Sequence, residues 1–264
     1  MTETRKNIPA LCLLLLVFCG CAAAPKMTAR LDVASAEAAL EHLAARLPAD
    51  AALLAMADVR VATQAREGAY PLKLAVLLKK PSSLRVEAIP LFGPPAFFLS
   101  VHDRTLKVFL AQTSSFYIGR ATQDNVGRYL PLKMGPEDLI ALLTGTCFAP
   151  TGPDTLLQGR PEGDHYRIDI LEPTKRRTLW VRMTDGFLER FETYGGEQRL
   201  YRVHFEEPFH VEGTVLPQKI TFVSEGIDGV SVSIRYTDIQ LLKDVDPVLF
   251  DLETPPGVEP VYLD

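Results

Sequence analysis

The sequence predicts a mainly β protein with one large, curved, antiparallel up-and-down sheet, an open or half barrel of roughly eleven strands. From about Leu54 onward, apolar residues recur at every second position for most of the chain, as on strands with one face in water. Short turn segments separate these runs, and few segments have helical spacing. A barrel this wide is not filled by its own side chains. The sequence therefore predicts an apolar cavity covered by a few short helices.

The alternation assigns a face to each strand. The segments 71–80 and 83–90 each place apolar residues on one side, and the segments 96–103 and 104–112 form a predicted hairpin across "HDRT". The segment 230–241, the last predicted strand, alternates in the same way. The candidates for lining the cavity are Leu72, Leu74, Val76, Leu84, Val86, Leu99, Val101, Val232 and Ile234.

Two segments have clear helix signals. Ser35 is a plausible N-cap for a helix over 35–47, and Pro136 begins a helix over 136–144 that Gly145 ends. We expect these two helices to cover the cavity, and a weaker helix at 122–132. The Gly- and Pro-rich segment 151–164 predicts a loop between two series of strands. Both series are expected to share one sheet in a single domain, 35–250, followed by a Pro-rich surface tail, 251–264.

The N-terminus predicts export and lipidation. Arg5 and Lys6 precede the apolar run 11–18, which is too short to cross a bilayer and has the length of a signal peptide. The following "FCGC" resembles the lipobox of bacterial lipoproteins. That resemblance implies a signal peptide over 1–20, an acylated Cys21 as the first mature residue, and a tether over 21–34. The alternative is an ordinary cleaved signal with an unrelated cysteine. Ala22, in place of aspartate, favours the outer membrane.

Composition excludes some functions. The formal net charge of −5 becomes about −6 once the +1 of Glu3, Arg5 and Lys6 is removed with the signal, which argues against nucleic acid as a partner. No nucleophile elbow, phosphate-binding loop or dinucleotide fingerprint occurs, so we predict no enzyme activity and no cofactor. Cys147 lies among apolar residues and is interpreted as a small buried side chain.

Two charged motifs receive ordinary structural interpretations. His204 and His210 flank Pro208, which is expected to break the strand, so no metal site is predicted there. The basic run 175–177 is interpreted as a solvated hairpin tip.

The stretch 85–150 resembles the LolA/LolB-like superfamily of lipoprotein-localisation proteins, and within it the outer-membrane receptor LolB. The matching elements are "SLRVEAIP" running into the apolar turn "LFG", then "FYIGRA" and "LPLKMGPEDLIALLTG". The resemblance implies a half barrel whose apolar cavity takes lipoprotein acyl chains from a periplasmic LolA-like carrier. It also implies that Phe92, with Leu91 beside it, contacts the membrane. The alternative is that Leu91 and Phe92 pack as core.

Two departures leave the cargo open. "GPP" follows where the family has polar residues, and the chain has a single Trp, so a paralogue that binds another lipid remains an alternative. The predicted function is that of a lipid-anchored, periplasm-facing outer-membrane lipoprotein that binds acyl chains and helps to localise lipoproteins or lipids. The second reading is a non-enzymatic structural or assembly-factor lipoprotein with a protein partner.

Overall fold

The computed structural model describes residues 35–63, 66–90, 96–147, 152–225 and 229–263, and their strands form one open sheet of fourteen strands, against the predicted eleven or so. The first series is β1 (Ala51–Thr63), β2 (Arg66–Lys79), β3 (Ser83–Ile89), β4 (Phe97–His102), β5 (Thr105–Leu110) and β6 (Ser115–Arg120). The second is β7 (Leu156–Glu162), β8 (His165–Leu171), β9 (Arg176–Arg182), β10 (Leu188–Gly195), β11 (Gln198–Val211), β12 (Thr214–Ser224) and β13 (Val230–Lys243). A short strand, β14 (Pro260–Tyr262), follows near the C-terminus.

The two series meet at the middle of the sheet. The order is β14-β6-β5-β4-β3-β2-β1-β13-β12-β11-β10-β9-β8-β7, so the first strand of the chain pairs with the last long one. That antiparallel pairing runs from Ala51 opposite Lys243 to Thr63 opposite Val230. The prediction that both series share one sheet is confirmed, and the long β1–β13 ladder is the reason.

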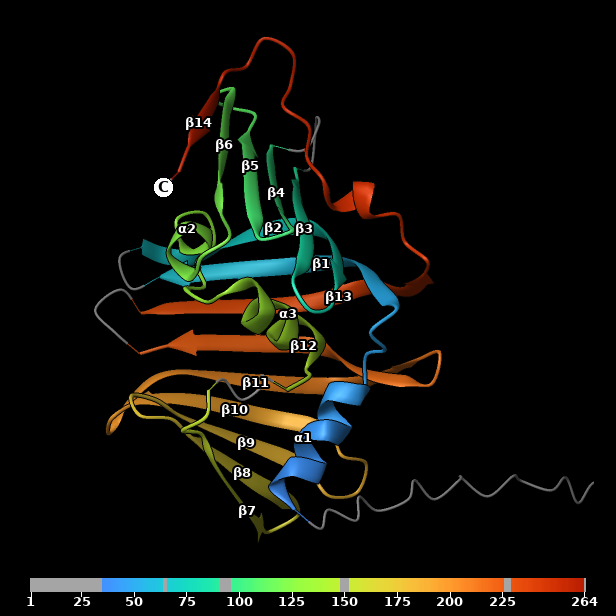
Figure 1. Ribbon diagram of the computed structural model, residues 1–264, viewed down its shortest axis with the longest axis vertical. Coiled ribbons are helices and arrows are strands. Elements are labelled where there is room, and N and C mark those ends of the chain that lie inside the picture. The colour runs from blue at the N-terminus through green and yellow to red at the C-terminus, as the bar shows by residue number, and fades with distance from the viewer. Residues whose placement is uncertain (1–34, 64–65, 91–95, 148–151, 226–228, 264) are drawn as a thin grey trace, which may run out of the picture.

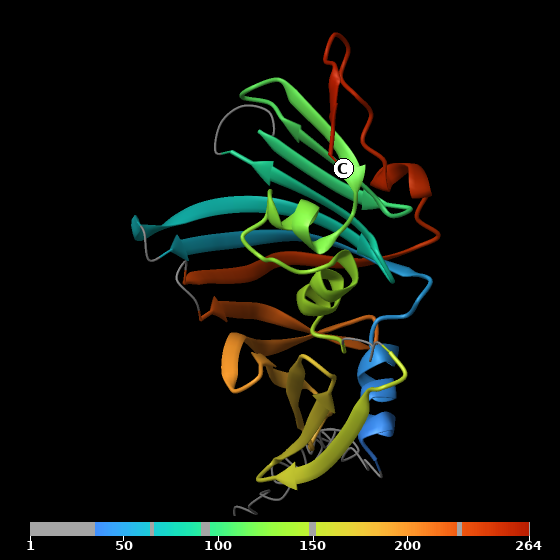
Figure 2. The ribbon, with the colours of Figure 1, turned by 60° about the vertical axis from the view of Figure 1, so that its left-hand side comes forward.

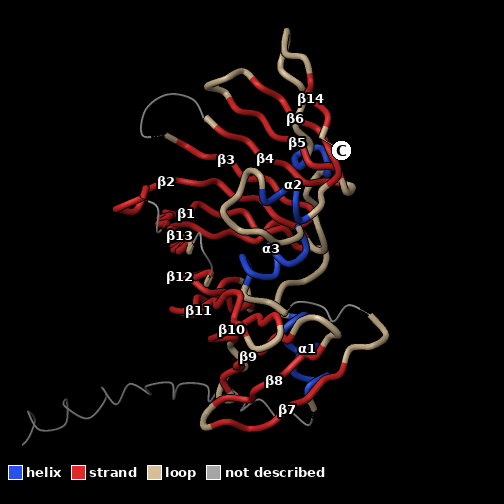
Figure 3. Tube along the Cα trace, turned by 90° about the vertical axis from the view of Figure 1, so that its left-hand side faces the viewer, coloured by secondary structure: helices blue, strands red, loops and turns tan. Residues whose placement is uncertain are grey.

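Three short helices lie on one side of the curved sheet (Figures 2 and 3). They are α1 (Ala36–Ala45), α2 (Gln123–Gly127) and α3 (Pro136–Thr144). The predicted cap is present, since the Ser35 side chain accepts a hydrogen bond from the Ala38 amide at 3.2 Å. At the end of α3, Gly145 has φ of 61°, and a Cβ there would lie 2.9 Å from Cδ of Pro217, so glycine is required twice over.

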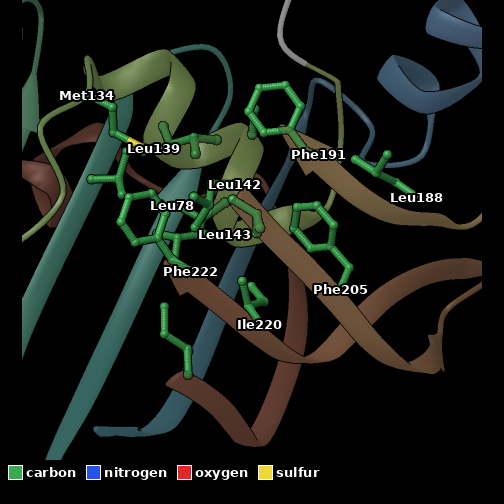
Figure 4. Close-up of a cluster of buried hydrophobic side chains, with 14 of the residues drawn as sticks. Leu78, Met134, Leu139, Leu142, Leu143, Leu188, Phe191, Phe205, Ile220 and Phe222 are labelled. Carbon is green, nitrogen blue, oxygen red and sulfur yellow. The ribbon is translucent and has the colours of Figure 1, made fainter. Parts of the chain in front are cut away.

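Helix α3 packs into the middle of the concave face. Its residues Leu139, Ile140, Leu142 and Leu143 are buried, and Figure 4 shows the labelled leucines among sheet side chains such as Phe222. The hydroxyl of the fully buried Tyr236, in β13, donates a hydrogen bond to the Leu143 carbonyl at 2.8 Å. Because the last carbonyls of a helix have no partner within it, this bond satisfies a group that burial would otherwise leave unpaired.

Replacing Tyr236 by phenylalanine should therefore destabilise the protein without changing its shape. Leaving the buried Leu143 carbonyl unpaired is expected to cost about 1–3 kcal/mol of unfolding free energy. Urea denaturation measures this difference. Tyr262→Phe, at a side chain that is 76% exposed, serves as the control and should change the midpoint little. Equal midpoints for Tyr236→Phe and wild type would contradict the assignment.

Two local predictions were wrong, and each error concerns a strand with a free edge. The segment 151–164 contains β7, which pairs only with β8 at the end of the sheet, where its Pro161 is tolerated. Pro208 does not end β11. Beyond His204 that strand pairs only with β12, so its other edge is free and does not require a backbone N–H from every residue. The tail also contains a strand that was not predicted, β14, which pairs in parallel with β6 while its Val261 and Tyr262 stay exposed at the surface.

Candidate functional site

An apolar cavity of about 270 Å³ lies between the concave face of the central strands and the segment that carries α3. The sheet provides residues from β1, β2, β3, β4 and β13, and the helical segment closes the other side. Apart from the Tyr129 hydroxyl, no lining side chain carries a polar group. The lining residues are Val59, Val61, Leu72, Leu74, Val76, Val86, Ala88, Phe97, Tyr129, Leu130, Pro131, Leu132, Leu139, Leu143, Val232 and Ile234.

The structure brings six of the nine candidate residues to this cavity. They are Leu72, Leu74, Val76, Val86, Val232 and Ile234. The other three, Leu84, Leu99 and Val101, are fully buried in the core and do not line it. Leu72 is 44% exposed, so the apolar lining continues to the protein surface and gives the cavity an entrance.

The cover of the cavity differs from the one expected. Leu139 and Leu143 of α3 line it, as the prediction that this helix covers the cavity requires, but no residue of α1 does. Helix α1 lies beside the far strands, where Arg46, just after it, donates to the Asp185 carbonyl at 2.9 Å. The segment 129–132 takes the remaining place. The weak helix predicted over 122–132 ends at Gly127, so this segment is irregular, and its part in the cavity wall was not predicted.

The connection from α2 holds this segment in place. The amides of Tyr129 and Leu130 both donate to the Val126 carbonyl at 3.1 Å, and the Tyr129 ring lies 5.4 Å from the Tyr117 ring of β6. Burial raises the pKa of the Tyr129 hydroxyl, which keeps it neutral beside the apolar lining.

Cys21, Leu91 and Phe92 lie outside the described residues. Ala88 and Phe97, the nearest cavity-lining residues before and after the segment 91–95, belong to the paired strands β3 and β4.

The groups that could carry reactions are few in the described part of the chain. No group of three or more His, Cys, Asp and Glu side chains there converges as a metal site requires. The half-buried Cys147 donates from Sγ to the Leu40 carbonyl at 3.3 Å, and burial raises the pKa of its thiol, which disfavours the nucleophilic thiolate. None of the helices in these residues is long and apolar enough to cross a membrane.

A second hollow, of about 460 Å³, is lined by six charged side chains together with apolar ones and is called the charged hollow below. The interpretation of 175–177 as a solvated tip is wrong for Arg177, which is 6% exposed in β9 and pairs with Glu172 at 2.8 Å across this hollow's wall. Lys175 is exposed, as expected for a turn. No local pattern indicated that Arg177 is buried, because its partner Glu172 lies on the other side of the turn.

Comparison with known proteins finds solved structures that have a similar fold. No family model matches the sequence, and no curated protein matches it. Among solved structures, a LolA superfamily protein from Nitrosomonas europaea is 18% identical, with a TM-score of 0.60 over 83% of this chain and 99% of that one. A putative outer membrane lipoprotein-sorting protein domain from Vibrio parahaemolyticus is 11% identical, with a TM-score of 0.59 over 82% and 96%.

A third structure, a DUF1329 family protein from Desulfovibrio piger, is 11% identical, with a TM-score of 0.58 over 82% of this chain and 95% of that one. At these identities the similarity concerns the fold. The fold class of this chain is an open, curved antiparallel sheet with short helices on its concave side. Its particular form is the LolA-like fold.

Proposed function

We propose that this protein is a lipid-anchored, periplasm-facing outer-membrane lipoprotein that binds acyl chains in the apolar cavity and helps to localise lipoproteins or other lipids to that membrane. The observation that carries the proposal is the composition of the cavity wall, in which sixteen side chains present a single hydroxyl and no charge. The LolA-like fold of the chain supports the same function. The proposed activity is binding and transfer, with no chemical reaction.

The energetics suit an acyl chain. Each buried methylene contributes about 0.8 kcal/mol, so about ten buried methylenes supply the roughly 8 kcal/mol of a micromolar-scale affinity without any polar contact. A volume of about 270 Å³ accommodates part of one chain, and the partly exposed Leu72 marks where it enters. Burial of apolar surface is non-directional, so such a wall holds chains of different lipids.

The remaining parts of the proposal concern the membrane. Acylation of Cys21 would anchor the chain, since stable attachment needs more than one lipid chain or signal. Leu91 and Phe92 would add about 1.5–3 kcal/mol each if buried in lipid. Because Ala88 and Phe97 line the cavity, contact by the intervening segment would bring the cavity close to the leaflet. Acyl chains could then leave, or arrive from a periplasmic LolA-like carrier, with little exposure to water.

The direct test uses the mature polypeptide, residues 21–264 with Cys21→Ala, produced without its signal and stripped of lipid. We expect saturable binding of a fluorescent fatty acid, with palmitate as an effective competitor. Mass spectrometry of the native protein purified from membranes should find bound lipid. If neither measurement detects lipid, the acyl-binding proposal fails and the structural or assembly-factor reading replaces it.

The membrane-contact role of the 91–92 pair predicts a separation of stability from function. Phe92→Glu should leave the melting temperature of this polypeptide almost unchanged, since surface substitutions usually cost within about 0.5 kcal/mol. It should reduce association with liposomes and delivery of acylated cargo. Glu197→Gln, in the exposed β10–β11 turn, is the control for liposome association. A large fall in melting temperature for Phe92→Glu would show that Phe92 is core, and the membrane contact would be abandoned.

A further inference from the structure

The charged hollow and the apolar cavity are neighbours on the concave face, on the two sides of the segment between α2 and α3. Pro131 lines both. On β13, Val230 lines the charged hollow and Val232 lines the cavity, and residues two apart on a strand are separated by about 7 Å on the same face. On α3, Asp138 belongs to the first and Leu139 to the second. An amphiphile of modest length would therefore reach both.

Part of the charged hollow is already neutralised by the protein. Glu172 accepts a hydrogen bond from Nη2 of the buried Arg177 at 2.8 Å, and Glu225 accepts one from Nε of Arg199 at 2.8 Å. Besides these two ion pairs, three other charged side chains line the hollow. Lys133 and Lys175 make no ion pair with a described residue, and neither does Asp138.

Two groups at this wall, the buried Arg177 and the half-buried Asp138, have incomplete hydrogen-bond or ion-pair partners among the described residues. Arg177 is 6% exposed, yet its Nε has no hydrogen-bond partner within the described structure, which is costly for a buried guanidinium. Burial also raises the pKa of the Asp138 carboxyl, an effect that Arg177 and Lys175 offset in part. The protein encloses the Arg177 Nε, so a ligand would meet Arg177 only as a positive charge in the wall. A ligand that accepts from Lys133 and Lys175 and donates to Asp138 would pair the charges that the protein leaves open.

We infer that the charged hollow holds the polar end of the lipid whose acyl chain occupies the cavity, and that this end is a zwitterionic phosphoethanolamine group. The phosphate would lie against Lys133, Lys175 and Arg177, and the ammonium against Asp138. Met134 and Phe222, which also line the hollow, suit the apolar part of the glycerol region. An anionic headgroup without an ammonium would leave Asp138 unpaired beside a negative charge. This inference rests on the proposed function and narrows its ligand to a phospholipid class.

The test compares three probes on the residue 21–264 polypeptide with Cys21→Ala. The probes are a fluorescent fatty acid and the phosphatidylethanolamine and phosphatidylglycerol that carry the same labelled chain. The polypeptide with Asp138 intact should bind phosphatidylethanolamine with about fivefold or more higher affinity than phosphatidylglycerol. Asp138→Asn should remove this preference and leave fatty-acid binding unchanged. Glu137→Gln, an exposed acidic neighbour in the same first turn that does not line the hollow, should change neither.

A second variant tests the phosphate side. Lys175→Gln, at an exposed position that tolerates substitution, should weaken both phospholipids by about threefold and spare the fatty acid. Equal affinity for the two phospholipids, or an Asp138→Asn protein that keeps the preference, would overturn the headgroup site while fatty-acid binding still supports the cavity. Tight binding of free phosphoethanolamine would overturn the lipid assignment. No binding of any probe would overturn both proposals.

Discussion

Replacing Leu74 by aspartate is expected to lower the affinity of the cavity for a fluorescent fatty acid by about tenfold or more. Leu74 lies on the concave face of β2, between Ala57 of β1 and Ala88 of β3, and lines the cavity near its entrance. An acyl chain bound there would have to strip water from the new carboxylate, and an ionised group without a partner resists this strongly. Titration of the fatty acid against wild type and variant measures the loss.

The chain offers a matched control on the other face of the sheet. Leu54 in β1 is 36% exposed and does not line the cavity, so Leu54→Asp introduces the same charge with no expected effect on binding. Thermal unfolding of both variants separates lost binding from lost structure. Leu74→Met, which keeps the volume and the apolar character, should retain most of the affinity. If Leu54→Asp weakens binding as much as Leu74→Asp, the fatty acid binds elsewhere.

Cys21→Ala is expected to remove the protein from the outer membrane. Acyl chains on Cys21 would supply nearly all of the anchoring free energy, since each buried methylene contributes about 0.8 kcal/mol and a pair of apolar side chains cannot replace them. The variant should accumulate as a soluble or inner-membrane-tethered precursor. Membrane fractionation with metabolic labelling by palmitate measures both location and acylation.

Cys19→Ala is the matched control for this experiment. It changes a cysteine two residues away to the same small residue, and acylation, cleavage and location should all remain as in wild type. A Cys21→Ala protein that still fractionates with the outer membrane would contradict the lipoprotein proposal, whether or not the cavity binds fatty acid.

Local patterns in the sequence predicted much of this fold, because strand faces and helix ends depend on neighbouring residues. Alternation in 71–80 and 83–90 placed the right side chains on the concave face, and Pro136 with Gly145 marked both ends of α3. The hairpin predicted across "HDRT" turns at Asp103 and Arg104, whose φ angles are 46° and 63°. Six cavity residues followed from the same two-residue period.

The sequence by itself thus determined the face on which each strand residue lies, the covering helix and the apolar character of the cavity wall. Only the tertiary structure decided how deeply each side chain is buried and which side chains from distant segments lie beside it. Leu72 is 44% exposed at the entrance while Leu84 on the same face is fully buried, because what lies above each depends on segments far away in the chain. Asp138 of α3 and Arg177 of β9 likewise line the same hollow only because α3 packs on the concave face of the sheet. Period and propensity are local, whereas the packing that builds a site joins residues with no local relation.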